Sequence, residues 1–288
     1  MKAIFKHELS SYFTSLTGYV FGAFLLLFAG IYMMAYNLNA LYTNFEYVMS
    51  GMSFVFLVIV PILTMRTLAE ERRQKTDQLL YSLPISMTEV VLGKYAAMLV
   101  MLLIPVLIIC VYPLILSAYG NVYLPASFSA ILGFFCLGAA LLAIGTYVSS
   151  VTESQAVAAG LCFVVMLVNY FLADVASLLS TTAFSSLAAF AALALVIAGV
   201  VYLMTKNGFA SLMCAAVLEA ALVAVYVVDS SLYEGLFPEL MEQLSLFERF
   251  YVLVDGVFDV TSLVYLISVA ALFLFLSVQS LEKRRWSE

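Results

Sequence analysis

The residues best suited to chemistry are charged, and they gather in one stretch, Leu63–Tyr95, which reads "LTMRTLAEERRQKTDQLLYSLPISMTEVVLGKY". Of the twelve Lys and Arg residues in the chain, this stretch holds five, which are Arg66, Arg72, Arg73, Lys75 and Lys94. Opposite charges stand four residues apart at Glu71–Lys75 and Arg73–Asp77, and three apart at Glu70–Arg73. Such spacing stabilises a helix through ion pairs. The chemistry that this pattern favours is ionic contact with a partner.

The same stretch predicts two helices with a break between them. Pro84 ends the charged helix, and Ser86 with Glu89 has the S-x-x-E spacing of a capping box. A second helix should therefore begin at Ser86 and continue into the next apolar run. A charged helix held between two spans suits the transmission of force to a cytoplasmic partner. The alternative is that positive charge simply collects in a cytoplasmic loop.

Two carboxylates fall at or near membrane depth. Glu219 is central in one apolar run, and Asp174 lies near the outer end of another. An ionisable side chain inside a span is by default a functional hypothesis. Glu219 is a candidate proton or substrate site, or else a protonated, hydrogen-bonded structural group.

Other kinds of site lack their residues. The sequence contains no G-x-x-x-x-G-K-[ST] motif, so we expect no nucleotide or other cofactor on this chain and no enzyme activity. The only histidine is His7, which excludes an ordinary zinc site or a Ser–His pair within the membrane. The four cysteines stand singly in apolar runs without metal-ligand spacing, and they are Cys110, Cys136, Cys162 and Cys214.

Composition places these residues in an integral membrane protein. The 288 residues are 65% hydrophobic and 10% charged, with a mean hydropathy of +1.10, whereas soluble domains carry about 25% charged residues. The apolar runs are long enough for spanning helices, so we expect an all-α fold in one transmembrane domain over residues 1–288. The net charge of −6 does not indicate a nucleic-acid partner.

Hydropathy predicts eight spans, since a helix needs about 20 apolar residues to cross the bilayer. The candidates are Gly18–Leu38, Val48–Thr67, Tyr95–Ser117, Ser127–Ser149, Gln155–Val175, Phe184–Met204, Gly208–Val228 and Thr261–Leu281. The alternative is six spans, with Phe184–Val228 forming a shallow or re-entrant hairpin.

Charge distribution sets the orientation. With the N-terminus and the C-terminus both cytoplasmic, eleven of the twelve cations face the cytoplasm, and only Arg249 lies outside. This bias is what the positive-inside rule predicts.

Two segments outside the spans are amphipathic. Residues 1–17 place apolar side chains at helical spacing and lysines on the other side, which suits a helix on the inner membrane surface. Residues 229–259 predict two amphipathic helices on, or dipping into, the outer leaflet. The outer helices would either cap a translocation path or form a structural lid.

Three stretches together resemble one family. They are "FKHELSSYFTSLTGYVF", "PILTMRTLAEERRQKTDQLLYSLPISMTEVVLGKY" and "LFERFYVLVDGVFDVTSLVYLISVAALFLFLSVQSLEKRRW". In their order and content they resemble the permeases of ABC-2-type transporters, particularly the gliding-motility and copper-enzyme-maturation branch of bacteria. Many members have six spans, so the extra hairpin departs from the simplest family pattern.

The resemblance implies how the chain is used. Residues 1–17 would be the connecting helix, and residues 68–93 would be the coupling loop that docks on a separate ATPase subunit, which binds ATP and Mg. A smaller contact would come from the turn "SSVTESQ". The implied coupling residues are Glu70, Glu71, Arg72, Arg73, Lys75, Thr76, Asp77, Leu79, Leu80, Pro84, Ser150, Glu153 and Ser154. A second permease chain, the lipid bilayer of a bacterial inner membrane and an extracytoplasmic accessory protein complete the implied surroundings.

The leading functional hypothesis is the membrane subunit of an ATP-driven exporter. One alternative is a proton-coupled carrier that uses Glu219, although the two halves show no convincing internal repeat. Another is a subunit that transports nothing and relays ATP hydrolysis mechanically to an outer partner through residues 229–259.

Overall fold

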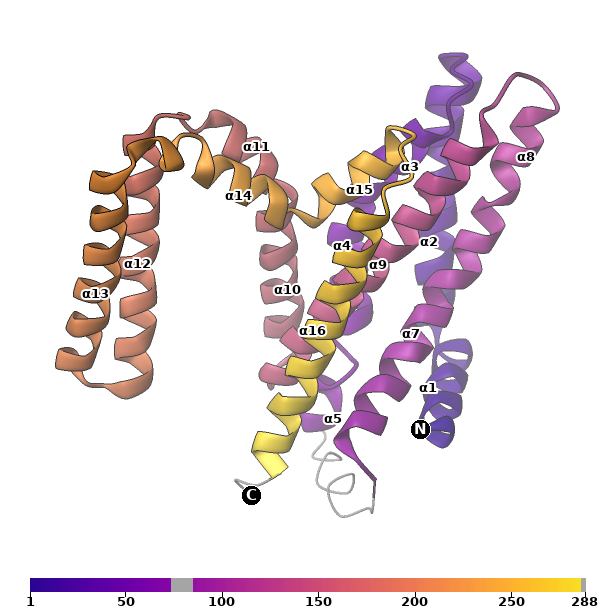
Figure 1. The fold of residues 1–288 in the computed structure, drawn as a ribbon. Coiled ribbons are helices and arrows are strands. Elements are labelled where there is room, and N and C mark those ends of the chain that lie inside the picture. Colours follow the sequence, from indigo (N-terminus) through magenta and orange to yellow (C-terminus); the bar gives the residue numbers. More distant parts are fainter. Residues whose placement is uncertain (74–84, 286–288) are drawn as a thin grey trace. The chain divides into compact units, whose positions relative to one another are not determined.

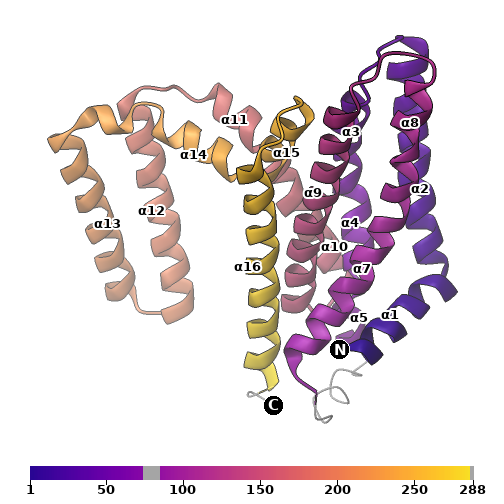
Figure 2. The ribbon, with the colours of Figure 1, turned by 45° about the vertical axis from the view of Figure 1, so that its right-hand side comes forward.

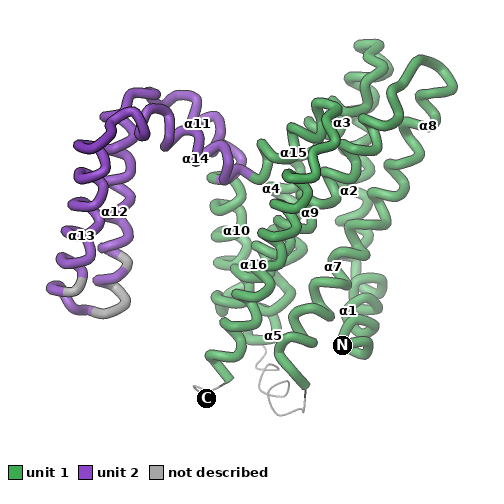
Figure 3. The backbone as a smooth tube through the Cα atoms, viewed as in Figure 1, with its two compact units in different colours: residues 1–168, 246–288 green, residues 169–245 purple. Residues whose placement is uncertain are grey.

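The computed structural model describes residues 1–73 and 85–285, and every regular element in these ranges is helical. The expected all-α membrane fold is therefore confirmed. The chain divides into two compact units, which Figure 3 colours separately. Unit 1 comprises residues 1–168 and 246–288, and unit 2 comprises residues 169–245. The expectation of one functional permease domain stays a prediction.

Unit 1 contains both the N-terminal helices and the C-terminal helix, and the C-terminal helix runs beside α9 in both views of the ribbon (Figures 1 and 2). Its elements are α1 (Lys2–Thr14), α2 (Leu16–Met33), the π-helix η1 (Met34–Asn39), α3 (Glu46–Met52), the 3₁₀-helix η2 (Ser53–Val55), α4 (Phe56–Thr64), α5 (Ala69–Arg73), α7 (Met87–Ile109), α8 (Val111–Ser117), α9 (Leu124–Val151), α10 (Gln155–Tyr170), α15 (Leu246–Val254) and α16 (Val260–Arg285).

The predicted amphipathic segment 1–17 forms a helix that ends earlier than expected. Helix α1 stops at Thr14 because Ser15 is extended, with φ −91° and ψ 155°, and α2 begins at Leu16. Helix α1 packs against α7. The approach is close at Gly93, where a Cβ atom would lie 3.1 Å from Cγ2 of Ile4. The N-terminal helix is thus held by protein as well as being suited to a membrane surface.

Helix α9 is the centre of unit 1. It packs against α16, α15, α7 and α4. Small residues permit this close packing. If Gly145 carried a side chain, its Cβ atom would lie 2.5 Å from Oγ1 of Thr64 on α4, which is too close for a real contact. Phe56 and Phe134 stack in the same core, with ring centroids 4.3 Å apart. Small residues at helix interfaces are typical of packing within a bilayer, where close approach replaces hydrophobic driving force.

Unit 2 is built around a pair of antiparallel helices. Its elements are α11 (Leu172–Leu178), α12 (Ala183–Thr205), α13 (Gly208–Val228), the 3₁₀-helix η3 (Ser230–Tyr233) and α14 (Leu236–Leu244). Helices α12 and α13 pack on each other, and Ser211 on α13 donates a hydrogen bond to the carbonyl of Ala198 on α12 (2.6 Å). The tight turn between them contains Lys206 in the left-handed region, with φ 50°.

Each of the eight predicted spans coincides with an observed helix or pair of helices. By length and apolar composition alone, six helices of the described chain could cross a membrane, or seven if the bent pair α10 and α11 is one span. Helix α12 counts only as a shorter apolar helix, over its residues 183–199. A multi-pass membrane protein is established, while the number of eight and the side of each terminus stay predictions.

The outer segment 229–259 forms two short helices, as expected, but they belong to different units. Helix α14 lies in unit 2, and α15 lies in unit 1, where it packs on α9. Phe247 and Phe250 of α15 are completely buried or nearly so. Arg249, the one cation predicted outside, lies over the ring of Tyr265 at 5.5 Å. The apolar face of α15 is therefore covered by protein rather than left for lipid.

Candidate functional site

The predicted coupling residues that the structure describes converge at the end of unit 1 where α5 begins. The backbone amides of Leu68 and Ala69 both donate to Oγ of Ser149, at 3.2 and 3.1 Å. Ser149 is the third residue from the end of α9 and is fully buried. The first amides of a helix have no partner within it. A hydroxyl group from the central helix supplies that partner here and fixes where α5 starts.

Arg72 links α5 to the turn between α9 and α10. Its Nη1 donates to the carbonyl of Thr152 at 3.0 Å. This turn is the "SSVTESQ" segment, for which the resemblance implied a second contact with the ATPase. The two predicted coupling segments are therefore joined to each other, although they lie 80 residues apart in sequence.

The basic end of α16 holds the same turn from the other side. Arg284 donates from Nη2 to the carbonyl of Val151 at 2.9 Å, and its Nη1 lies 3.7 Å from a carboxylate oxygen of Glu153. Ser280 donates to the carbonyl of Ser150 at 3.4 Å. Helix α5, the turn and α16 thus form a continuous set of contacts, which we call the cytoplasmic cluster after the side on which the charge distribution predicts it to lie.

A buried ion cluster ties α5 to the N-terminal helix. Lys94, on α7, is only 3% exposed. Its ammonium group donates to Glu8 on α1 at 2.6 Å and to Glu71 on α5 at 2.7 Å. A buried ammonium ion is costly unless it is paired, so each carboxylate compensates the desolvation of Lys94. Movement of α5 would disturb α1 and α7 through this ion cluster.

The surroundings of this ion cluster are low in polarity. Burial raises the pKa of the nearby Tyr12 phenol on α1, and the charge of Glu8 acts in the same direction. The phenol therefore stays neutral. Glu8 and Lys94 were not among the predicted coupling residues. Lys94 could have been suspected from its place beside Gly93 at the start of an apolar run, but no spacing rule connects it with Glu8.

Exposure separates the predicted coupling residues into two groups. Arg73, Glu153 and Ser154 are exposed and can meet a partner protein directly. Glu70, Glu71 and Arg72 are half-buried, and Ser150 is fully buried. The remaining predicted residues lie outside the described ranges, and they are Lys75, Thr76, Asp77, Leu79, Leu80 and Pro84. The predicted start of the next helix is confirmed, since Oγ of Ser86 accepts from the amide of Glu89 at 3.2 Å.

The two carboxylates predicted at or near membrane depth both belong to unit 2. Asp174 is exposed on α11, and Glu219 is half-buried on α13. Within residues 1–73 and 85–285, no group of three or more His, Cys, Asp or Glu side chains could hold a metal ion. The arrangement at the cytoplasmic cluster can hold elements together and pass on movement.

A family model described as "ABC-2 family transporter protein" matches residues 12–211. This range includes α5, Lys94 and the α9–α10 turn, and it ends within α13. No curated protein matches the chain.

Proposed function

The chain belongs to the ABC-2 family of transporter proteins, and from that membership we propose that it is the membrane-spanning permease subunit of an ATP-driven exporter. A separate nucleotide-binding subunit binds ATP and Mg and hydrolyses the ATP. The permease lies in the inner membrane of a bacterium and works with a second permease, either another copy or a related chain. The permease itself binds no cofactor.

The observation that carries this proposal is the cytoplasmic cluster. Ser149 caps α5, Arg72 bonds to Thr152, and Lys94 joins α5 to α1 and α7. A displacement applied to α5 by a partner is therefore opposed at once by α9, α7 and α1. That connection supports a loop that converts movement of an ATPase into movement of the spans. A loop that merely collected positive charge would not need these bonds.

The test is a charge reversal at exposed coupling residues. We would purify the chain from its native membranes in lipid nanodiscs and identify by mass spectrometry any copurifying subunit with nucleotide-binding motifs. Arg73→Glu and Glu153→Lys leave the Arg72–Thr152 bond in place, and Glu153→Lys also replaces the surface ion pair of Glu153 with Arg284. Each should lower ATPase retention or ATP turnover about tenfold or more, because like charges facing each other across an interface cost several kcal/mol.

The matched control is Lys206→Glu, a charge reversal in the α12–α13 turn of unit 2, which should leave both readouts unchanged. Glu219→Gln distinguishes the carrier hypothesis. If both coupling variants behave like the unaltered protein while Glu219→Gln abolishes transport, the permease proposal is wrong and a proton-coupled carrier replaces it. If charge reversal of the exposed Glu234 and Glu239, which leaves the packed helix α15 in place, abolishes function while ATP turnover persists, mechanical relay to an outer partner replaces export.

A further inference from the structure

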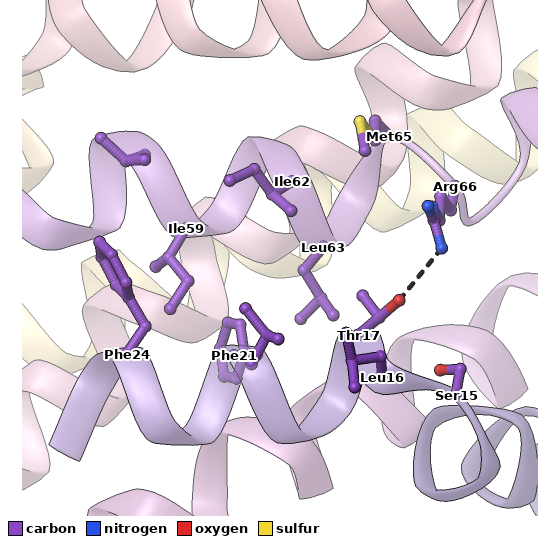
Figure 4. Close-up of a pocket in the computed structure, with 12 residues that line it drawn as sticks. Ser15, Leu16, Thr17, Phe21, Phe24, Ile59, Ile62, Leu63, Met65 and Arg66 are labelled. Carbon is purple, nitrogen blue, oxygen red and sulfur yellow. Dashed lines mark hydrogen bonds between the residues drawn. The ribbon is translucent and has the colours of Figure 1, made fainter. Parts of the chain in front are cut away.

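A cavity of about 440 Å³ lies between α2 and α4, within unit 1 (Figure 4). Its size falls in the range of about 300–1,000 Å³ that is usual for small-molecule sites. Most of its wall is apolar, with Phe21 and Phe24 from α2 and Ile59 and Ile62 from α4. Ser15, Thr17 and Arg66 gather at one end, as Figure 4 shows.

In the orientation that the charge distribution predicts, the polar end of the cavity is the cytoplasmic end. Ser15 separates α1 from α2, and Arg66 follows α4 just before α5 begins. The apolar wall therefore runs from the level of the inner headgroups into the hydrocarbon. Several lining residues are exposed, including Val20 (52%) and Ile62 (45%). The cavity is thus accessible to lipid of the inner leaflet.

Arg66 has hydrogen-bonding capacity to spare. Its Nη1 donates to Oγ1 of Thr17 at 3.1 Å. In the described ranges no carboxylate lies within ion-pair distance of it. A guanidinium group has five N–H donors in a planar fork, which matches a phosphate group. An anion at this end would be bound by charge and by geometry together.

The same charge argues against a second copy of the chain as the occupant. In a twofold dimer a residue of one copy meets a different residue of the other unless it lies on the axis, and none of the described residues that line this cavity is a carboxylate that could meet Arg66. A phospholipid instead supplies an anion for Arg66 and an apolar chain for the wall. Anionic lipids are also enriched in the cytoplasmic leaflet.

We propose that this cavity binds one anionic phospholipid of the inner leaflet. Its phosphate group accepts hydrogen bonds from Arg66 and from the hydroxyl of Thr17. One acyl chain lies between Phe21 and Phe24 on one side and Ile59 and Ile62 on the other. The lipid fills the space between the first two spans next to α5 and holds their cytoplasmic ends at a set separation.

The test is native mass spectrometry of the full chain, titrated with phosphatidylglycerol or with phosphatidylcholine of the same acyl chains. The unaltered protein should retain one phosphatidylglycerol about tenfold more tightly than phosphatidylcholine, as a hydrogen-bonded charge contact predicts. Arg66→Gln should abolish that preference. Ile62→Trp, which fills the exposed side of the cavity, should release both lipids. This measurement needs no ATPase, so its result is independent of the proposed permease function.

Two matched controls accompany these variants. Lys283→Gln removes an exposed cation from the end of α16, and Leu272→Trp enlarges an exposed leucine of the same helix. Both should retain the lipid with its preference. An Arg66→Gln protein that still prefers phosphatidylglycerol overturns the proposal. An Ile62→Trp protein that retains lipid also overturns it. If that variant in addition loses its oligomeric state, the surface is the contact with a second copy of the chain.

Discussion

At the scale of single residues, Lys94 is the group that joins α5 to both α1 and α7. It pairs with carboxylates that lie 86 and 23 residues away in sequence, and it does so almost without contact with solvent. Charge spacing along the chain predicted ion pairs within the loop, such as Glu71–Lys75. The structure shows Glu71 bound to Lys94, whereas Lys75 lies outside the described residues. Local patterns identify charged helices, but they do not reveal which distant helix brings the counter-ion.

We expect Lys94→Met to destabilise the protein by about 3–5 kcal/mol, because it leaves Glu8 and Glu71 without their buried partner. Thermal unfolding in detergent should show a clearly lower midpoint. Lys283→Met, at an exposed cation, should unfold like the unaltered chain. Adding Glu8→Gln and Glu71→Gln to Lys94→Met should recover part of the loss. An unchanged midpoint for Lys94→Met would contradict a paired, buried ammonium group.

Asp259 allows a test by pH. The hydroxyl of Ser262 and the amides of Ser262 and Thr261 donate to its carboxylate at the start of α16 and lower its pKa below 3.8. Because the pKa of Asp259 is lower in the folded state than in the unfolded state, its ionised carboxylate stabilises the fold. This contribution is complete above the ordinary carboxyl pKa and is lost as the pH falls through the lowered pKa of the folded state. The unfolding midpoints of the unaltered protein and Asp259→Ala should therefore differ at pH 7 and converge as the pH falls through the lowered pKa of Asp259. A difference that persists at low pH would show that the charge is irrelevant.

At the scale of elements, the sequence was sufficient to find the helices and insufficient to find how they pack. The predicted runs coincide with observed helices because long apolar stretches have few alternatives in a membrane. The break at Ser15 and the π-helix at 34–39 were not predicted. In the π-helix, Asn37 is buried and its side-chain amide donates to the carbonyl of Tyr42, five residues further on, at 2.8 Å, a contact that hydropathy does not indicate.

Gly145 on α9 and Gly160 on α10 provide a matched pair of glycine substitutions. Alanine at Gly145 would place a Cβ atom 2.5 Å from Thr64, whereas at Gly160 of α10 no atom lies within 4 Å. Gly145→Ala should lower stability by about 1–3 kcal/mol through overpacking. Gly160→Ala should be neutral or stabilising, since alanine is the better helix former. Thermal unfolding compares the two, and equal midpoints would mean that α4 and α9 are not in close contact at Gly145.

At the scale of the whole molecule, family and fold class followed from the sequence, while the division into two units did not. The charged loop and the turn 149–155 were both identified as coupling segments, and their direct connection through Arg72 and Thr152 required the structure. The finer assignment to one branch of the family stays a prediction. So does the number of spans, because the α12–α13 pair is apolar enough for either arrangement.

Topology can be measured at the α12–α13 turn. In a chain whose four native cysteines are replaced, Lys206→Cys should react with a membrane-impermeant maleimide only after the cells are permeabilised, as eight spans require. The control is a cysteine at exposed Asp255, in the outer segment, which should react in intact cells. If Lys206→Cys stays unreactive after permeabilisation, the pair is a re-entrant hairpin and the chain has six spans.

The division of unit 1 between residues 1–168 and 246–288 has a consequence for how the protein is made. Helix α9 enters the membrane during synthesis well before α15 and α16, the helices that cover it. All of unit 2 leaves the ribosome in the interval. The surface of α9 that α15 and α16 later cover must therefore stay exposed to lipid or to the insertion machinery until those helices are made. Truncated nascent chains that stop before residue 246 should accordingly be the forms that quality-control proteases degrade, and completion of α16 should end that exposure.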